Sequence, residues 1–238
     1  MTQLNGISFH DKVANGWTAG YQRASFRKRL DVFDQLLRLR VKPGQRWLDL
    51  GCGSGVLTRR LVDLGACVVA VDGSAAMLKH AKEANADVSE ATLEFVESDV
   101  QNLSWAASES FDGVLCSSVV EYLNDPSLAF GEASRVLRRG GVFIFSVPPT
   151  GSAVRLTQKI GRALARLVGR DLFAYLVVSK YEMHPTVIPK IMIDHNFVLA
   201  SVTEFDPLLP RQMLRFLRPT LLIAEATKSI DDHSRGSA

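Results

Sequence analysis

The sequence contains few cysteines, and their number limits what they can do. Cys52, Cys67 and Cys116 are the only three among 238 residues. Three cysteines cannot form the multi-bridge framework that stabilises small secreted domains. Each lies in an apolar run, which predicts reduced, buried thiols and a cytoplasmic protein.

Long apolar runs and a strong charge of one sign are also missing. No run approaches the roughly 18 consecutive apolar residues of a membrane-spanning helix. Residues 1–10 lack the basic start and apolar stretch of a signal peptide, so we expect none. The 28 Lys and Arg residues nearly balance the 25 Asp and Glu residues, which leaves a net charge of +3. This balance argues against a polyelectrolyte tail and against a histone-like nucleic-acid binder.

What the sequence does contain is a regular alternation of short apolar runs and helix-spaced segments. Strands are predicted at residues 46–50, 66–71, 93–97, 111–116 and 142–147. Helices are predicted at residues 56–64, 75–84 and 126–137. This alternation predicts an α/β fold of right-handed βαβ units, with a mostly parallel sheet and helices on both faces.

The rhythm changes after residue 150. Residues 151–185 begin as a basic helix and become irregular, and residues 187–195 read as another helix. Two late strands are predicted at 197–205 and 221–227, and the segment between them is too long for a tight hairpin.

A glycine-rich loop follows the first predicted strand. Gly51, Gly53 and Gly55 alternate with Cys52 and Ser54, and a helix is predicted directly after them. Glycine allows a sharp turn and lets a ligand lie against the backbone. The start of the helix offers unpaired N–H groups. This arrangement predicts a ligand site at the loop.

Two kinds of ligand suit such a loop. Asp72 ends the second predicted strand, where a carboxylate accepts the hydroxyl groups of a ribose. The dinucleotide fingerprint is G-x-G-x-x-G, whereas the spacing here is G-x-G-x-G with Val56 next, which disfavours a dehydrogenase. Asp49, two residues before the first glycine, would repel a pyrophosphate. S-adenosylmethionine (SAM) carries a sulfonium and an ammonium and no phosphate, so the charges favour SAM.

Five motifs together resemble the class I SAM-dependent methyltransferases, in the small-molecule branch that includes the ubiquinone-biosynthesis O-methyltransferases. They lie at residues 47–55, 71–72, 97–100, 111–114 and 137–141. The resemblance covers residues 9–150 well. It implies a single Rossmann-like domain with seven strands, in which the late pair forms the antiparallel end. The implied parts are an N-terminal helical lid (1–42), a cofactor-binding core (43–150), an acceptor cap (151–196), the last two strands (197–228) and a tail (229–238).

The resemblance also implies a set of cofactor contacts. Asp72 would hold the ribose hydroxyls, Asp99 the adenine amino group, and Ser117 would flank the methionine part. The full predicted set is Asp49, Gly51, Cys52, Gly53, Gly55, Asp72, Met77, Asp99, Val100, Cys116, Ser117 and Tyr21. Asp112 precedes a strand and is interpreted as structural.

Methyl transfer from a sulfonium is a one-step displacement, and a general base is needed only for a protonated acceptor such as a hydroxyl. Glu121 and Tyr122 follow the fourth strand, and His184 lies in the acceptor cap, so these three are the predicted catalytic residues. Ubiquinone-type relatives have a Glu-x-x-Glu-His run here that is associated with a divalent metal. Only Glu121 of that run remains, so we expect no metal site.

A basic set recurs at helical spacing after residue 150. Its members are Arg155, Lys159, Arg162, Arg166 and Arg170, and Leu156, Ile160, Leu164 and Leu167 occupy the other side. Such a face suits an anionic membrane surface or an acidic partner, and equally an ordinary solvated helix.

These observations predict O-methylation of a small molecule that is apolar, lipid-linked or anionic, by a cytoplasmic enzyme with peripheral membrane contact as an open option. The alternatives are a methyltransferase of the same fold acting on a protein or nucleic acid, and a non-catalytic cofactor-binding module. Base flipping is not supported, because residues 117–120 lack the Asn/Asp-Pro-Pro-aromatic motif of amino-methylating enzymes.

Overall fold

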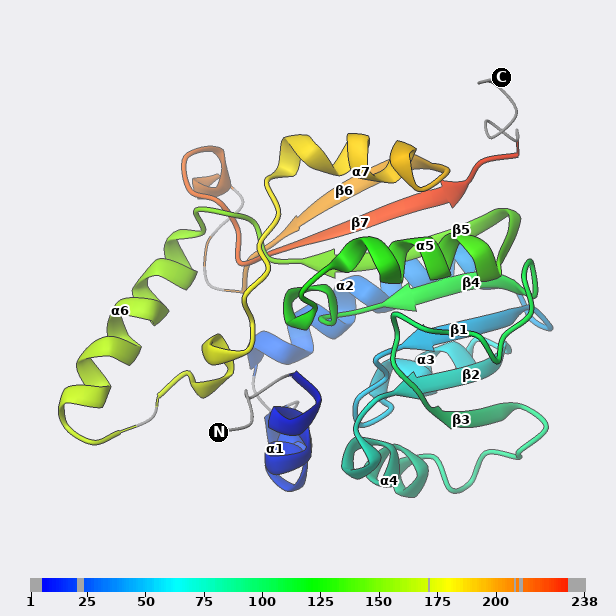
Figure 1. Cartoon of the computed structure of the whole chain (residues 1–238), viewed down its shortest axis with the longest axis horizontal. Helices are drawn as coiled ribbons and strands as arrows, with labels where there is room; N and C mark the ends of the chain where they lie inside the picture. The colour runs from blue at the N-terminus through cyan, green and yellow to red at the C-terminus, as the bar shows by residue number, and fades with distance from the viewer. Residues whose placement is uncertain (1–5, 21–23, 171, 208, 210–211, 231–238) are drawn as a thin grey trace.

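The computed structural model describes residues 6–20, 24–170, 172–207, 209 and 212–230. Its strands form one seven-stranded sheet in the order β3-β2-β1-β4-β5-β7-β6 (Figure 1). The strands are β1 (Arg46–Leu50), β2 (Cys67–Asp72), β3 (Leu93–Glu97), β4 (Phe111–Cys116), β5 (Leu137–Val147), β6 (Phe197–Phe205) and β7 (Leu221–Lys228). The predicted seven-stranded, mostly parallel sheet is therefore confirmed.

Seven α-helices belong to the described part of the chain. They are α1 (Gly6–Gly20), α2 (Ala24–Arg40), α3 (Val56–Asp63), α4 (Ala75–Ala84), α5 (Pro126–Val136), α6 (Ala153–Leu167) and α7 (Ile188–Asp194). Four short 3₁₀ turns join them, at Val120–Tyr122, Ala174–Val177, Pro185–Val187 and Met213–Arg215. None of the described helices is long and apolar enough to cross a bilayer.

The direction of the last two strands refines the expectation. β7 runs antiparallel to both of its neighbours, β5 and β6. β6 therefore points the same way as the parallel strands, and β7 is the reversed one. β5 also begins at Leu137, five residues before its predicted start, because Leu137 pairs with Phe111 ahead of an irregularity in the register.

Alternate residues of the strands build two apolar cores, one on each face of the sheet. Leu48 and Leu50 of β1 join the core that includes α5 and α7. Trp47, the residue before Leu48 in β1, points to the other face and joins the core that includes α2 and α3. Because side chains alternate along a strand, both faces of a central strand need apolar residues. The helices therefore cover both faces, as predicted.

Cys67 departs from the expectation of three buried thiols. Cys52 and Cys116 are buried, whereas Cys67 is exposed. Cys67 is the first residue of β2 and pairs in register with Arg46, the exposed first residue of β1. Both residues begin their strands at the amino end of the sheet, where the Cys67 side chain is exposed.

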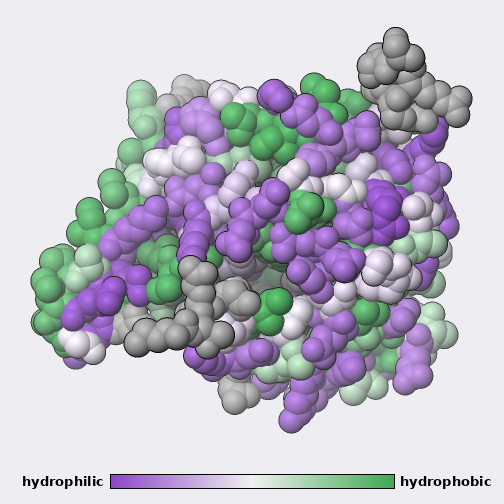
Figure 2. Space-filling view, viewed as in Figure 1, coloured by the Kyte–Doolittle hydropathy of each residue, from purple (hydrophilic) through white to green (hydrophobic). Residues whose placement is uncertain are grey.

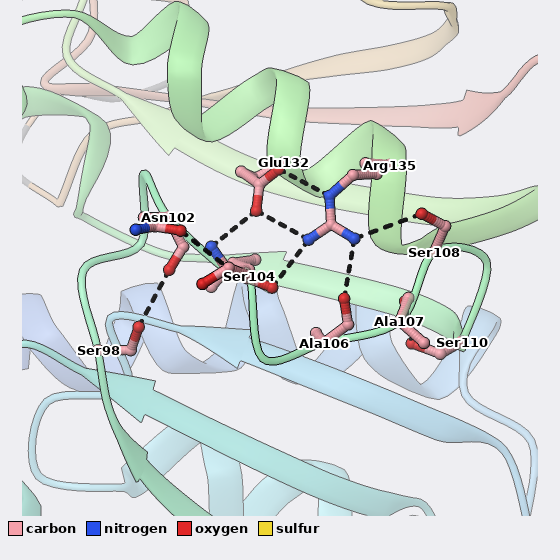
Figure 3. A network of polar contacts seen from close by, with 10 residues as sticks. Ser98, Asn102, Ser104, Ala106, Ala107, Ser108, Ser110, Glu132 and Arg135 are labelled. Carbon is pink, nitrogen blue, oxygen red and sulfur yellow. Dashed lines mark hydrogen bonds and ion pairs between the residues drawn. The ribbon is translucent and has the colours of Figure 1, made fainter.

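Side chains of α5 hold the loop between β3 and β4 in place through hydrogen bonds (Figure 3). Arg135 donates to the carbonyl oxygens of Leu103 and Ala106, each at 2.8 Å. Glu132 pairs with Arg135 and accepts from the Leu103 N–H at 2.7 Å. These bonds satisfy loop carbonyls that no strand partner reaches, and they fix the segment that follows Asp99.

Candidate functional site

A cavity of about 1010 Å³ opens at the carboxyl ends of β1, β2 and β4. This is the edge where ligands bind in parallel α/β sheets. Most of the predicted site residues line it, namely Asp49, Gly51, Cys52, Gly53, Asp72, Met77, Asp99, Val100, Ser117, Glu121 and Tyr122. Gly55, Cys116 and His184 are not among the lining residues, and Tyr21 lies outside the described residues.

The glycine loop has the backbone shape that its composition predicts. Gly51, Gly53 and Gly55 all have left-handed φ angles, of 67°, 54° and 78°. A Cβ on Gly51 would lie 2.2 Å from Val119 Cγ2, so a larger residue would clash. A Cβ on Gly53 would meet nothing within 4 Å, which leaves that side of the loop open to a ligand.

Asp72 is held in place by the loop that it faces. Its Oδ2 accepts the Gly53 N–H at 2.9 Å and its Oδ1 accepts the Ser74 N–H at 2.8 Å. Burial raises the pKa of Asp72, and these two hydrogen bonds lower it. A carboxylate has about four lone-pair sites, so capacity remains for two hydroxyl donors.

Asp49 lies beneath the loop and is buried. Its Oδ2 accepts the Thr58 hydroxyl at 2.7 Å. Burial raises the pKa of Asp49 to about 7, with the hydrogen bond from Thr58 lowering it and the nearby charge of Asp72 adding to the rise. Two carboxylates that disfavour each other's ionisation are relieved by a cation, so this end of the cavity suits a positively charged ligand.

Asp99 and Val100 line the cavity beyond β3. The Asp99 Oδ1 accepts the Gln101 N–H at 2.9 Å, which orients the carboxylate. Val100 is buried and joins the apolar core. A carboxylate beside an apolar wall suits the amino group and the flat face of a purine.

Glu121 belongs to the short 3₁₀ turn after β4 and is buried. The residue is only 6% exposed. Burial raises the pKa of Glu121 to about 7, against the lowering effect of Arg29 and Arg155. Among the described residues, no hydrogen-bond partner reaches its Oε2, nor the Ser117 Oγ. Buried polar atoms normally have a partner, so these two atoms leave hydrogen-bonding capacity beside the cavity.

Tyr122 is covered by α1. The ring of His10 packs edge-on against the Tyr122 ring, with centroids 4.7 Å apart. Burial raises the pKa of Tyr122 well above its ordinary value. The phenol therefore stays neutral at physiological pH, which suits a hydrogen-bond donor and not a base.

His184 is not among the residues that line the cavity. Its Nδ1 lies 2.7 Å from the Thr186 hydroxyl, and the Arg218 guanidinium lies 2.9 Å from its Nε2. It also caps the short turn that begins at Pro185. The cavity lining thus includes Glu121 and Tyr122 but not His184, and the catalytic role of His184 stays a prediction.

Two arginines line the cavity that the sequence did not single out as ligand residues. Arg29 of α2 donates to the Ser118 hydroxyl at 2.8 Å and lies over the Phe26 ring. Its Nε is buried with no partner within the described chain. Arg155 bonds to Ser179 and pairs with Glu182 at 3.2 Å. On a helix with both acidic and basic residues, the sequence does not show which arginine points into a cavity. Arg29 was therefore not predicted as a ligand residue.

The basic face predicted for α6 is not simply a solvated one. Arg155 is buried, and Lys159 pairs with Glu182 at 2.7 Å. Arg166 and Arg170 are exposed. Arg218, outside this set, donates to the Thr150 carbonyl oxygen. Asp112, interpreted as structural, accepts from the Arg46 N–H and the Arg138 guanidinium.

Across the described ranges, no group of three or more His, Cys, Asp or Glu residues is arranged to hold a metal ion.

The sheet order and the site define a Rossmann-like fold of the class I methyltransferase type. A family model described as a methyltransferase domain matches residues 48–145. A ubiquinone biosynthesis O-methyltransferase from Xanthomonas axonopodis pv. citri is 30% identical over 184 residues, which cover 73% of this chain and 77% of that protein. The chain therefore belongs to the class I SAM-dependent methyltransferases, whose cosubstrate is SAM.

Two further comparisons set the extent of the similarity. A ubiquinone biosynthesis O-methyltransferase from Hahella chejuensis is 34% identical over 118 residues, so the matched part spans 50% of this chain and about half (48%) of that relative. A chain from the complex of the Haloferax volcanii Trm112 methyltransferase activator with a methyltransferase superposes with a TM-score of 0.69. It is 18% identical, with 92% of this chain and 97% of that chain covered, and it supports the fold alone.

Proposed function

We propose that this protein transfers the methyl group of SAM to a hydroxyl oxygen of a small, largely apolar acceptor. The observation that carries the proposal is the Glu121 carboxyl, which belongs to the cavity lining and whose buried Oε2 has no hydrogen-bond partner among the described residues. The curated relatives named above are O-methyltransferases, which supports oxygen as the acceptor atom.

The residues around the glycine loop offer a partner for each polar group of SAM. Asp72 would accept from the ribose hydroxyls, and Asp99 would accept from the adenine amino group. The ionised form of Asp49 would offset the positive charge of the ligand. Arg29 would pair with the methionine carboxylate, because a carboxylate gives its unpartnered Nε a charged acceptor. The open side of Gly53 leaves room for the backbone contact.

The N-terminal helices would cover the cofactor. Ile7 and His10 of α1 line the cavity. Asp11 accepts from the Ser74 hydroxyl at 2.5 Å, which ties α1 to the start of α4. Excluding water from the methyl donor prevents its hydrolysis and strengthens the charge interactions in the site.

The acceptor end of the cavity is predominantly aromatic. Phe26 of α2, Phe173 and Tyr175 after α6, and Phe205 at the end of β6 line it. The total volume lies at the upper end of the roughly 300–1,000 Å³ of small-molecule sites, which suits two ligands bound side by side. The proposed acceptor is therefore an aromatic or lipid-linked hydroxyl compound.

SAM supplies a methyl group on a sulfonium that is already a good leaving group. Alignment of the acceptor oxygen with that methyl would provide most of the rate, about 7–11 kcal/mol from orientation. Glu121 in its carboxylate form would accept the hydroxyl proton as the oxygen is methylated. Its pKa of about 7 lets it be ionised at physiological pH while remaining a useful base.

The test is methyl transfer to a panel of hydroxylated aromatic and prenylated compounds, measured as demethylated SAM formed. Glu121→Gln should lower kcat by roughly 10²–10⁴-fold and leave the SAM Kd nearly unchanged. His184→Ala is the matched control and should retain activity, because His184 lies outside the cavity lining. Tight SAM binding with no acceptor methylated would favour the non-catalytic module, and full activity of Glu121→Gln would exclude Glu121 as the base.

A further inference from the structure

The apolar side of α6 faces solvent. Leu156, Ile160, Leu164 and Leu167 are 59%, 52%, 61% and 81% exposed. Val168, directly after the helix, is 72% exposed. In Figure 2 hydrophobic side chains gather along the lower left edge of the molecule, where Figure 1 places α6. We call these five residues the α6 apolar ridge.

The ridge is a continuous stripe. At about 100° per residue its four helical members fall within roughly 80° of the helix circumference. The 15-residue helix is about 22 Å long at 1.5 Å per residue. The opposite side of α6 belongs to the cavity, because Arg155 and Gln158 line it. A soluble protein rarely leaves such a contiguous apolar stripe in water without a use for it.

The charges beside the ridge select its occupant. Arg166 lies on one flank of the stripe and Arg170 follows the end of the helix, and both are exposed, whereas Lys159 on the same flank pairs with Glu182. No Asp or Glu occurs between residues 153 and 170. A second copy docked symmetrically on this face would bring the same cations together, which costs free energy. An anionic lipid surface instead offers acyl chains to the leucines and headgroups to the cations.

We propose that the α6 apolar ridge seats this protein on an anionic lipid bilayer surface, with α6 lying parallel to the membrane plane. Leu164 and Leu167 enter the interface, while Arg166 and Arg170 contact the headgroups. Phe173 lies beside Gly161 of α6, is 39% exposed and also lines the cavity. The docked face therefore adjoins the acceptor end of the cavity, and a lipid-linked acceptor has a short path from the bilayer to Glu121.

The test is co-sedimentation of the full chain with phosphatidylcholine vesicles containing about one third phosphatidylglycerol. The wild type should bind, and Leu164→Glu/Leu167→Glu should lower the partition coefficient at least tenfold. The matched control is Leu39→Glu/Ile193→Glu, which changes two equally exposed apolar residues on α2 and α7 and should bind as the wild type does. Arg166→Glu/Arg170→Glu should weaken binding to anionic vesicles and abolish its salt dependence.

Hydrogen exchange of the wild type on vesicles, which needs no variant, should show added protection confined to α6 and the residues after it. No binding of the wild type at low salt, or equal losses in the ridge and control variants, would overturn the proposal. A dimer that dissociates with Leu164→Glu/Leu167→Glu, seen by light scattering without lipid, would assign the ridge to a second copy instead. None of these measurements requires turnover, so they succeed or fail independently of the proposed methyl transfer.

Discussion

Burial raises the pKa of two carboxyl groups in the cavity, and the two groups lie at different ends of that cavity. Asp49 lies under the glycine loop beside Asp72, and Glu121 lies at the aromatic end near Arg29. Burial disfavours the charged form of each. Because one would meet a cation and the other a hydroxyl proton, pH should separate their effects.

SAM binding should depend on the ionisation of Asp49. Below a pH of about 7 the carboxyl is protonated in the free protein and attracts the cation poorly. The affinity for SAM should therefore rise between pH 6 and 8, and Asp49→Asn should weaken binding about tenfold at pH 8 and flatten the profile. Calorimetry measures both. A profile that stays steep in Asp49→Asn but flattens in Glu121→Gln would assign the ionisation to Glu121.

The rate of methyl transfer should depend on the ionisation of Glu121. A base must be deprotonated, so kcat should rise as the pH increases through about 7 and then level off. The Glu121→Gln enzyme should show a low rate without this rise. A wild-type rate that falls over the same pH range would contradict the assignment.

The pH dependence of folding stability tests the ionisation of Glu121 independently of the rate. The pKa of Glu121 is higher in the folded chain than its ordinary value of 4.5. The folded state therefore loses stability as the pH rises from about 4.5 to about 7. Glu121→Gln should raise the melting temperature relative to the wild type at pH 8 and change it little at pH 4.5. Equal shifts at both pH values would mean that the effect comes from packing and not from charge.

At the scale of elements, the apolar runs predicted the strands closely, because a strand buried on both faces has few alternatives. Residues 93–97 and 111–116 became strands with the predicted bounds. The periodicity of α6 showed two faces but not which one meets the protein. That choice depends on Glu182 and Ser179, which lie far along the chain and hold Arg155 inward. The pattern of one helix contains no information about these partners.

The contact between α5 and the loop after β3 makes a prediction at this scale. Arg135→Met removes the bonds to the carbonyl oxygens of Leu103 and Ala106 while keeping the length of the side chain. The free energy of unfolding should fall by roughly 1–3 kcal/mol, and SAM affinity should fall with it because the Asp99 segment loses its support. Denaturant unfolding and calorimetry measure the two effects. The surface variant Arg38→Met, which removes only an exposed pair with Asp34, should change neither by more than a few tenths of a kcal/mol.

For the whole molecule, the sequence predicted the cofactor end of the site far better than the acceptor end. Asp49, Asp72 and Asp99 lie at or just after the carboxyl ends of β1, β2 and β3, so the topology alone brings them to one side of the sheet. The proposed acceptor end is lined by side chains of α2, the segment after α6 and β6, which meet only through tertiary packing. Arg29 and Phe173 were therefore found only in the structure, and His184 is not among the lining residues.

The central claim is that the cavity at the carboxyl edge of the sheet is a SAM site in which Asp72 holds the ribose. Calorimetric titration of SAM into the wild type and into Asp72→Ala tests it most directly. We predict 1:1 binding to the wild type and an affinity loss of about 1–3 kcal/mol, or roughly 5–150-fold, in a folded Asp72→Ala protein. Undiminished binding by Asp72→Ala, or no binding of SAM by the wild type, would contradict the account.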